Sequence, residues 1–250
     1  MRRNVLSPYI IVALFFTALF APIISADDTT ISSNTTWSGN ITLEGNVTIS
    51  QGTTLIVAPG TTIDGGDGFA IEVYGTLKAQ SCYFYSSANP TAQSSHGQGL
   101  WQGIVIKPGG SATITDVEIE NTNVGVKSEG NLDVDNLTVR DSYLGIKNYG
   151  TANVEEFYSE YIDYEAIMNS GSLTLSAANI SNTSTGIQST GTLEVTNSSF
   201  SHIGAAITVK SGAATVNQIR LHTVSVGLSS DAGVKFSAVN ITGTDVALLV

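Results

Sequence analysis

The segment GIQSTGTLEVTNSSF, Gly186–Phe200, closely resembles the segment that begins twenty residues earlier, AIMNSGSLTLSAANI, Ala166–Ile180. Both contain a small residue, an apolar residue, several polar residues, a glycine, an alternating apolar pair, a polar bend and a further apolar residue. A second column of glycines follows the small residues, from Gly130 to Gly233. Such a short, regular period is typical of a solenoid. The small residues recur at spacings of 20 or 21: Gly125, Gly145, Ala166, Gly186, Ala206, Gly227 and Ala247.

The apolar residues within each repeat alternate, as β-strands require. Leu132 and Val134 alternate in one unit, and Leu193 and Val195 in another. Period two indicates strands with one buried face, whereas amphipathic helices repeat every three or four residues. Leucine-rich repeats have a similar period, but their leucine and asparagine pattern is missing. The sequence therefore predicts an all-β, single-stranded parallel β-helix with three short strands per coil of about 20–22 residues.

Equivalent positions are expected to stack into columns through the whole solenoid. One bend column is mostly polar, with Asn121, Asp141, Asn182 and His202, and predicts side-chain ladders at a turn. About nine coil steps of roughly 4.8 Å predict a rod some 43 Å long. Two inward ladders are expected, Val126, Ile146, Ile167, Ile187, Ile207 and Leu228, and Leu132, Ala152, Leu173, Leu193, Ala214 and Val234.

These columns resemble those of a known superfamily. Together with NVTISQGTTLIVAPGTTI (Asn46–Ile63) and GLWQGIVIKPGG (Gly99–Gly110), the pattern is similar to the right-handed parallel β-helix proteins of the pectin-lyase-like superfamily, especially their non-enzymatic cell-surface members. The resemblance covers roughly Asn40–Val250 and implies a right-handed coil. It leaves the activity open, because the superfamily includes lyases, hydrolases, adhesins and passive stalks.

The order of segments predicts an exported protein. Residues 1–26 contain MRRN, the apolar run IIVALFFTALF and the small-residue exit IISA, as in a cleaved secretory signal. We expect residues 27–40 to lead into a β-helix at 41–250, with a polar loop inserted at about 86–100. The final VALLV starts an unfinished coil, whose open edge predicts self-association. The expected location is secreted or at the cell surface.

Composition restricts the partners of this chain. It has 10 Lys+Arg against 21 Asp+Glu, a net charge of -11, which argues against nucleic acid and anionic membranes as partners. The single cysteine, Cys82, excludes an internal disulfide and is expected to point inward. The three histidines lack zinc-like spacing, and no calcium loop is visible, so no metal or cofactor is predicted.

The segment VEEFYSEYIDYEA, Val154–Ala166, replaces the usual Ser, Thr and Asn with acidic and aromatic residues. Aromatic faces with polar tips suit sugar rings or protein interfaces. Carbohydrate or a cell-surface protein is therefore the predicted partner. The alternative is that these tyrosines pack against each other at a bend. The candidate binding patch consists of Tyr143, Tyr149, Tyr158, Tyr161 and Tyr164.

A weaker candidate is a polar site for polysaccharide cleavage. Asp133 and Glu155 are expected to stack one coil apart, as are Lys127 and Lys147. Hydrolysis requires two carboxylates on one face, and a lyase requires a base. The alternative is a solvated acidic face with solubilising lysines. A groove containing all four would favour a lyase or glycoside hydrolase, and a flat face would favour a non-catalytic structural, adhesive or binding module.

Asparagine-linked glycosylation is also predicted. The sequence contains about twice as many N-x-S/T sequons as its composition predicts, which is typical of a glycosylated surface protein. Alternatively, the bends of a β-helix favour Asn followed by Thr. The candidate positions are Asn34, Asn40, Asn46, Asn136, Asn179, Asn182, Asn197 and Asn240.

Overall fold

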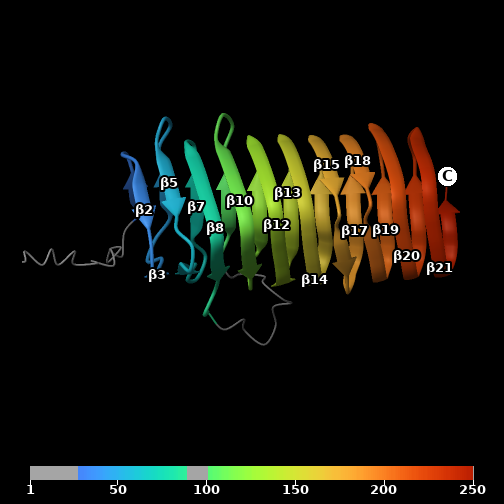
Figure 1. The fold of residues 1–250 in the computed structure, drawn as a ribbon, viewed down its shortest axis with the longest axis horizontal. Coiled ribbons are helices and arrows are strands. Elements are labelled where there is room, and N and C mark those ends of the chain that lie inside the picture. Colours follow the sequence, from blue (N-terminus) through green and yellow to red (C-terminus); the bar gives the residue numbers. More distant parts are fainter. Residues whose placement is uncertain (1–27, 89–100, 250) are drawn as a thin grey trace, which may run out of the picture.

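The computed structural model describes residues 28–88 and 101–249, so the predicted signal and most of the predicted polar loop lie outside the described residues. The described chain forms 21 strands and no helix (Figure 1). Within these ranges, no helix is long and apolar enough to cross a membrane. The strands are arranged in three parallel faces, which we call sheets 1, 2 and 3 in the order the chain passes through them.

Short strands occupy one sheet each. Sheet 1 contains β1 (Thr29–Ile31), β4 (Val47–Ile49), β7 (Ala70–Val73), β9 (Gly103–Ile106), β11 (Val124–Ser128), β13 (Leu144–Asn148) and β17 (Thr183–Ser189). Sheet 2 contains β2 (Thr35–Trp37), β5 (Thr54–Val57), β15 (Ser172–Ser176) and β18 (Thr192–Thr196). Sheet 3 contains β3 (Asn40–Thr42), β6 (Thr62–Asp64) and β16 (Asn179–Ser181).

Longer strands bend from one sheet into the next. Sheets 2 and 3 share β8 (Thr76–Tyr85), β10 (Ser111–Glu120) and β12 (Asn131–Ser142), and sheets 3 and 1 share β19 (Ser199–Val209). Three strands contribute to all three sheets: β14 (Thr151–Asn169), β20 (Ala213–Ser230) and β21 (Val234–Leu249).

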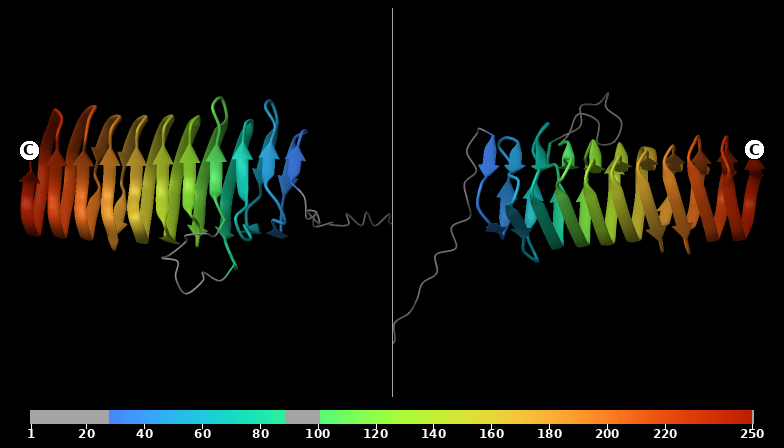
Figure 2. Two further views of the ribbon diagram at one scale, coloured as in Figure 1. Left: turned by 180° about the vertical axis from the view of Figure 1, so that it is seen from behind. Right: turned by 90° about the horizontal axis from the view of Figure 1, so that it is seen from above.

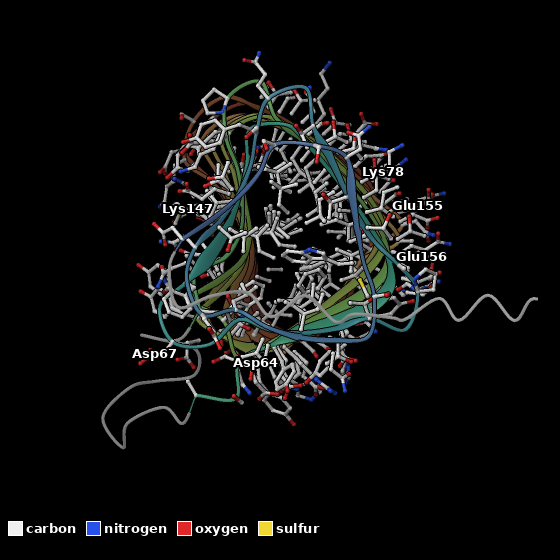
Figure 3. The ribbon with its side chains drawn as sticks, turned by 90° about the vertical axis from the view of Figure 1, so that its left-hand side faces the viewer. Asp64, Asp67, Lys78, Lys147, Glu155 and Glu156 are labelled. Carbon is white, nitrogen blue, oxygen red and sulfur yellow. The ribbon has the colours of Figure 1, made fainter. Side chains whose placement is uncertain are left out.

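Every strand pairs in parallel with its equivalent one coil further on, which confirms the predicted parallel β-helix. The register joins Val126 to Ile146 and Ile146 to Ile167, and it confirms both predicted apolar ladders. Seen from the N-terminal end, the chain passes from Asp64 through Asp67 to Lys78 clockwise as it recedes, so the helix is right-handed (Figure 3). The coils stack along one axis (Figure 2).

The β-helix is longer than the sequence predicts. Ten pairings link β1 to β21 through sheet 1, one step more than expected. The extra step arises because β1 and β2 already form part of a coil where residues 27–40 were expected only to lead into one. At about 4.8 Å per step, the stack is about 48 Å long.

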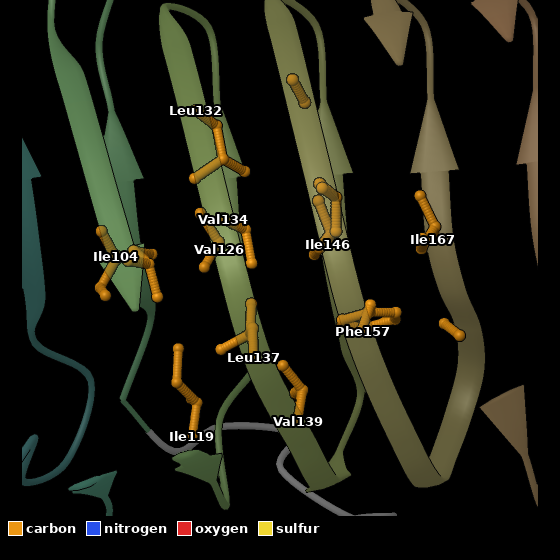
Figure 4. Packing of buried hydrophobic residues seen from close by; sticks show 14 of the residues in the cluster. Ile104, Ile119, Val126, Leu132, Val134, Leu137, Val139, Ile146, Phe157 and Ile167 are labelled. Atoms are coloured by element: carbon orange, nitrogen blue, oxygen red, sulfur yellow. The ribbon is translucent and has the colours of Figure 1, made fainter. Parts of the chain in front are cut away.

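The interior is filled by stacked apolar side chains (Figure 4). Phe84, Phe157 and Phe200 are fully buried in it. The column of small residues faces these rings: a Cβ atom on Gly186 would lie 2.8 Å from Cδ1 of Phe200. Cys82 points inward as predicted, and burial raises the pKa of its thiol to about 12. The repeated small residue therefore makes room for the aromatic rings of sheet 3.

The bends depend on left-handed backbone conformations. The polar bend column lies between sheets 3 and 1, and its members have positive φ, as Asn121 (54°) and Asp141 (49°) show. Asn and Asp adopt this conformation more readily than most side chains, which explains the polar column. His202 belongs to it structurally, as predicted. The coil of β14 differs, because it places Glu156 and Tyr161 at left-handed positions.

The expected amide ladder lies elsewhere, inside sheet 1. Asn148 Nδ2 donates to Asn169 Oδ1 at 2.9 Å, and Asn169 Nδ2 donates to Ser189 Oγ at 3.0 Å. Both amides also donate to backbone carbonyls, those of Ser172 and Thr192. These bonds satisfy side chains that would otherwise be costly to bury. We call Asn148, Asn169 and Ser189 the inner amide ladder.

Candidate binding surfaces

The described tyrosines and tryptophans are divided between the surface and the core by type. Trp37, Trp101 and the three phenylalanines named above are buried, whereas no described tyrosine is. Of the nine tyrosines in the sequence, Tyr9 lies outside the described residues. The other eight are restricted to the central coils: Tyr74, Tyr83, Tyr85, Tyr143, Tyr149, Tyr158, Tyr161 and Tyr164.

Charged side chains gather in the same central coils. Fifteen of the 21 acidic residues lie between Asp64 and Glu165, and only three follow: Glu194, Asp231 and Asp245. The later coils present mainly Ser, Thr, Asn and Ala, although they have the same fold. The chemical variety of the surface is therefore concentrated in about half of the rod.

Lysines and a tyrosine meet on the outer face of sheet 1. Lys127 and Lys147 are register partners on β11 and β13. Their ammonium nitrogens lie 5.7 and 5.5 Å from the ring centroid of Tyr149, within the range of cation–π attraction. Lys127 also pairs with Glu129 at 2.6 Å. Tyr149 nevertheless remains 46% exposed.

Tyr143 and Tyr164 stack at the bend that leads into sheet 1. Their ring centroids are 5.7 Å apart and their planes differ by 4°. The two residues thus lie one coil apart at the same bend, as the sequence predicts. The register of β14 shifts between Ile162 and Glu165, where the strand bulges. Although the rings pack on each other, Tyr164 is 48% exposed and can still contact a ligand.

Glu165, next to this stack, is an unusual buried acid that the sequence interpretation missed. It is only 4% exposed, and its Oε2 has no hydrogen-bond partner among the described residues. Burial raises the pKa of its carboxyl, and the charge of Lys147 opposes this shift. The sequence contains a signal for Glu165, because from Gly125 onward each of the other repeats has an apolar or small residue or Thr directly before the small residue. We define the sheet 1 patch as Lys127, Tyr143, Lys147, Tyr149, Tyr164 and Glu165.

A second polar cluster, also missed from the sequence, lies on sheet 3. Arg140 pairs with Glu118 at 2.6 Å and with Glu120 at 3.4 Å. The hydroxyl of Tyr83 donates to the carboxylate of Glu120, and the Tyr83 ring stacks on that of Tyr85 with centroids 5.1 Å apart. Burial and the Glu120 carboxylate raise the pKa of the Tyr83 phenol. Only the coil register brings these residues together, because 37 positions separate Tyr83 from Glu120.

The five predicted tyrosines do not form one patch. Tyr143, Tyr149 and Tyr164 belong to the sheet 1 patch, whereas Tyr158 lies on sheet 3 between Thr138 and Asn179 in the register. Tyr161 occupies the left-handed bend between the two sheets and is 51% exposed. The aromatic segment therefore divides between two surfaces, because the chain turns a corner within it.

The four residues of the predicted cleavage site are also separated. The register pairs Asp133 with Asn153 and Asp135 with Glu155, so the predicted stacking of Asp133 on Glu155 is wrong by two residues. The coil step here is 20 residues rather than the 22 that this stacking requires. Both carboxylates lie on sheet 2 and both lysines on sheet 1; Figure 3 shows Glu155 and Lys147 on opposite sides of the coil. In residues 28–88 and 101–249, no group of three or more His, Cys, Asp or Glu could hold a metal ion.

Several sequon asparagines have a structural role. Asn136, Asn182 and Asn197 occupy left-handed bends. Asn34 Oδ1 accepts the Thr54 N–H at 2.9 Å, and Asn46 Oδ1 accepts the Ala70 N–H at 3.0 Å. Glycosylation of all eight positions stays a prediction. The three remaining candidates are exposed on strands: Asn40, Asn179 and Asn240.

Comparisons with known proteins give no family for this chain. No family model matches the sequence, and no curated protein matches it either. The solved structures with distant likeness include two enzyme modules. The A-module of the Azotobacter vinelandii mannuronan C-5 epimerase AlgE6 shares 11% identity over 86% of this chain and 91% of that chain, with a TM-score of 0.35. The AlgE4 A-module from the same organism shares 11% identity over the same proportions, with a TM-score of 0.38. At these values the comparison adds nothing to the strand register, which by itself defines this chain as a parallel β-helix.

Proposed function

We propose that the protein is an exported, non-catalytic binding module of the cell surface. Its β-helix is the scaffold, and its central coils, residues 64–165, carry the binding groups. The observation that supports this function is the distribution of tyrosines: all eight described tyrosines are outside the core, and all lie in the central coils. Tyrosine supplies rigid apolar area with a polar tip, as binding surfaces require.

The later coils show that the fold itself does not require these side chains. On sheet 1, the positions aligned with Lys147 in successive coils are Met168, Gln188 and Thr208. The coils of Gln188 and Thr208 stack in the same parallel register without any tyrosine. A passive stalk could be built entirely from such coils, so the central tyrosines favour a binding role over a purely structural one.

The enzymatic alternative is less favoured by the geometry. A polysaccharide lyase or glycoside hydrolase based on the predicted residues would require them in one groove. Instead, Asp133 and Glu155 lie on sheet 2, and Lys127 and Lys147 lie on sheet 1. These four residues therefore share no common site.

The proposal is tested with the double variant Tyr143→Ala/Tyr164→Ala on glycan arrays and intact cells. We expect loss of binding of at least about tenfold, since exposed aromatic anchors commonly dominate interfaces. The matched control is Gln188→Ala/Thr208→Ala, which alters the same sheet in the later coils and should bind normally. Thermal melts should show that both variants fold.

Two results would overturn the proposed function. The first is unaltered binding by the tyrosine variant to every partner of the unmodified chain. The second is release of reducing or unsaturated ends from a polysaccharide incubated with the purified chain, because this would show catalysis. Export is checked separately by N-terminal sequencing of protein from the medium, which should begin at Asp27.

A further inference from the structure

A hollow on the outer face of sheet 3 lies apart from the sheet 1 patch. It has a volume of about 320 Å³ and spans three successive coils, formed by β12, β14 and β16. Pockets for small ligands start at about 300 Å³, so this one suits a single ring-sized group. The side chains that matter for recognition are Thr138, Arg140, Tyr158, Glu160, Asn179 and Ser181.

The strand register sets these side chains on a grid. Tyr158 lies between Thr138 and Asn179 in one column, and Arg140 lies next to Glu160 in the neighbouring column. Adjacent coils are about 4.8 Å apart, and outward side chains along one strand are about 6–7 Å apart. A ring of sugar size that lies on this grid can reach several polar groups at once.

Contacts outside the hollow hold its two charged groups in place. Arg140 Nη2 is fixed by Glu118 at 2.6 Å and by Glu120 at 3.4 Å, both on the preceding coil. On the following coil, Asn182 Nδ2 donates to Glu160 Oε1 at 3.1 Å. Guanidinium has five N–H donors and a carboxylate accepts up to four hydrogen bonds, so both groups retain capacity for a ligand. Such preorganisation reduces the entropy cost of binding.

The charges around the hollow disfavour anionic ligands. An anion approaching Arg140 would meet the carboxylates of Glu118, Glu120 and Glu160. A polyhydroxylated ring is suited to this mixture, because each hydroxyl both donates and accepts. The exposed ring of Tyr158 adds an apolar surface for the C–H face of such a ring.

Resting on the binding function proposed above, we propose that this hollow binds one residue of a neutral saccharide, with Tyr158 as the stacking platform and Arg140 and Glu160 as hydrogen-bonding partners of adjacent hydroxyls. The next coil lacks these features, because Ser199 and Ser201 are the register partners of Asn179 and Ser181. The site is therefore local to β12–β16 and is not a general property of the repeat.

The test is a calorimetric titration of the mature chain with neutral trisaccharides: cellotriose, maltotriose and mannotriose. A galacturonic acid trimer and a glucosamine trimer serve as charged probes. We expect at least one neutral trimer to bind, with Kd increased about tenfold in Tyr158→Ala and in Glu160→Ala. The matched control is Glu155→Ala, an exposed acid of the same strand β14 that lies on sheet 2 and should leave Kd unchanged.

The outcomes separate this inference from the proposed function. Tighter binding of either charged trimer than of every neutral one overturns the neutral ligand. If glycan binding is lost in Tyr143→Ala/Tyr164→Ala but retained in Tyr158→Ala and Glu160→Ala, the hollow is not the site and the proposed function stands. The same conclusion follows if the chain binds cells but no saccharide. Binding to neither saccharides nor cells overturns both.

Discussion

Gly186 shows why a coil requires a small residue at this position. A Cβ at this position would lie 2.5 Å from the carbonyl oxygen of Ala206 and 2.8 Å from Phe200 Cδ1. Gly186→Leu should therefore destabilise the fold by about 1–3 kcal/mol through overpacking. The control is Gly233→Leu, where nothing lies within 4 Å of the added Cβ. Equal denaturation midpoints for the two variants would contradict this account.

Glu165 predicts an unusual dependence of stability on pH. Its pKa is raised in the folded state, so the folded chain binds the proton more tightly than the unfolded chain does. Stability should therefore fall as pH rises from the unfolded pKa near 4.5 to the folded pKa. Glu165→Gln removes this loss, and each kcal/mol recovered should raise Tm by about 2–4 °C.

The measurement for Glu165 is a comparison of melting curves at pH 4 and pH 7. The gain in Tm from Glu165→Gln should be larger at pH 7 than at pH 4. Glu155→Gln, an exposed acid in the same strand, should show no such difference. A larger gain at pH 4 would show that Glu165 is stabilised as a charged group.

At the scale of the element, the inner amide ladder links three coils through side chains. Asn169→Ala should cost about 1–3 kcal/mol, because it leaves buried groups of Asn148 and Ser189 without their partner. The neighbouring substitution Ser170→Ala, at an exposed position, should cost much less. Chemical denaturation of the two variants checks the difference, and equal midpoints would show that the ladder is dispensable.

The strand periodicity could be predicted from the sequence, but the surfaces could not. The small column and the apolar ladders recur at nearly fixed intervals, so inward residues are identified by counting. Outward residues depend on which sheet a strand has reached: Tyr149 and Tyr158 are nine positions apart and occupy different sides of a bend. The bulge at Glu165 and the true partner of Asp133 required the register itself.

At the scale of the whole molecule, the last described strand is one of the open edges of the stack. Strand β21 pairs with β20 along one side, and none of the other described strands covers its second side. Because open edges recruit further strands, a purified polypeptide of residues 27–250 should self-associate as its concentration rises. Light scattering over a concentration series checks this, and strictly monomeric protein throughout would contradict it.

A charge placed on this edge strand should weaken the self-association. Ser237 of β21 is exposed and is the register partner of Asn217, so Ser237→Lys adds a charge to the edge at an outward position. Thr208→Lys places the same charge on an outward position in the middle of sheet 1 and serves as the control. If both variants reduce self-association equally, the cause is the added net charge and not the position of the charge on the edge strand.

The parallel stacking also determines how the molecule responds to force. Its strands run across the long axis, so the hydrogen bonds between coils lie nearly along that axis (Figure 1). Tension applied through the two chain ends loads the hydrogen bonds of one coil at a time. The hydrogen bonds of the other coils are not sheared at the same moment. Each coil of about 20 residues would then release roughly 65–70 Å of chain. Such a rod yields in small, repeated increments and absorbs mechanical work in each, while the coils not yet reached keep their surfaces intact.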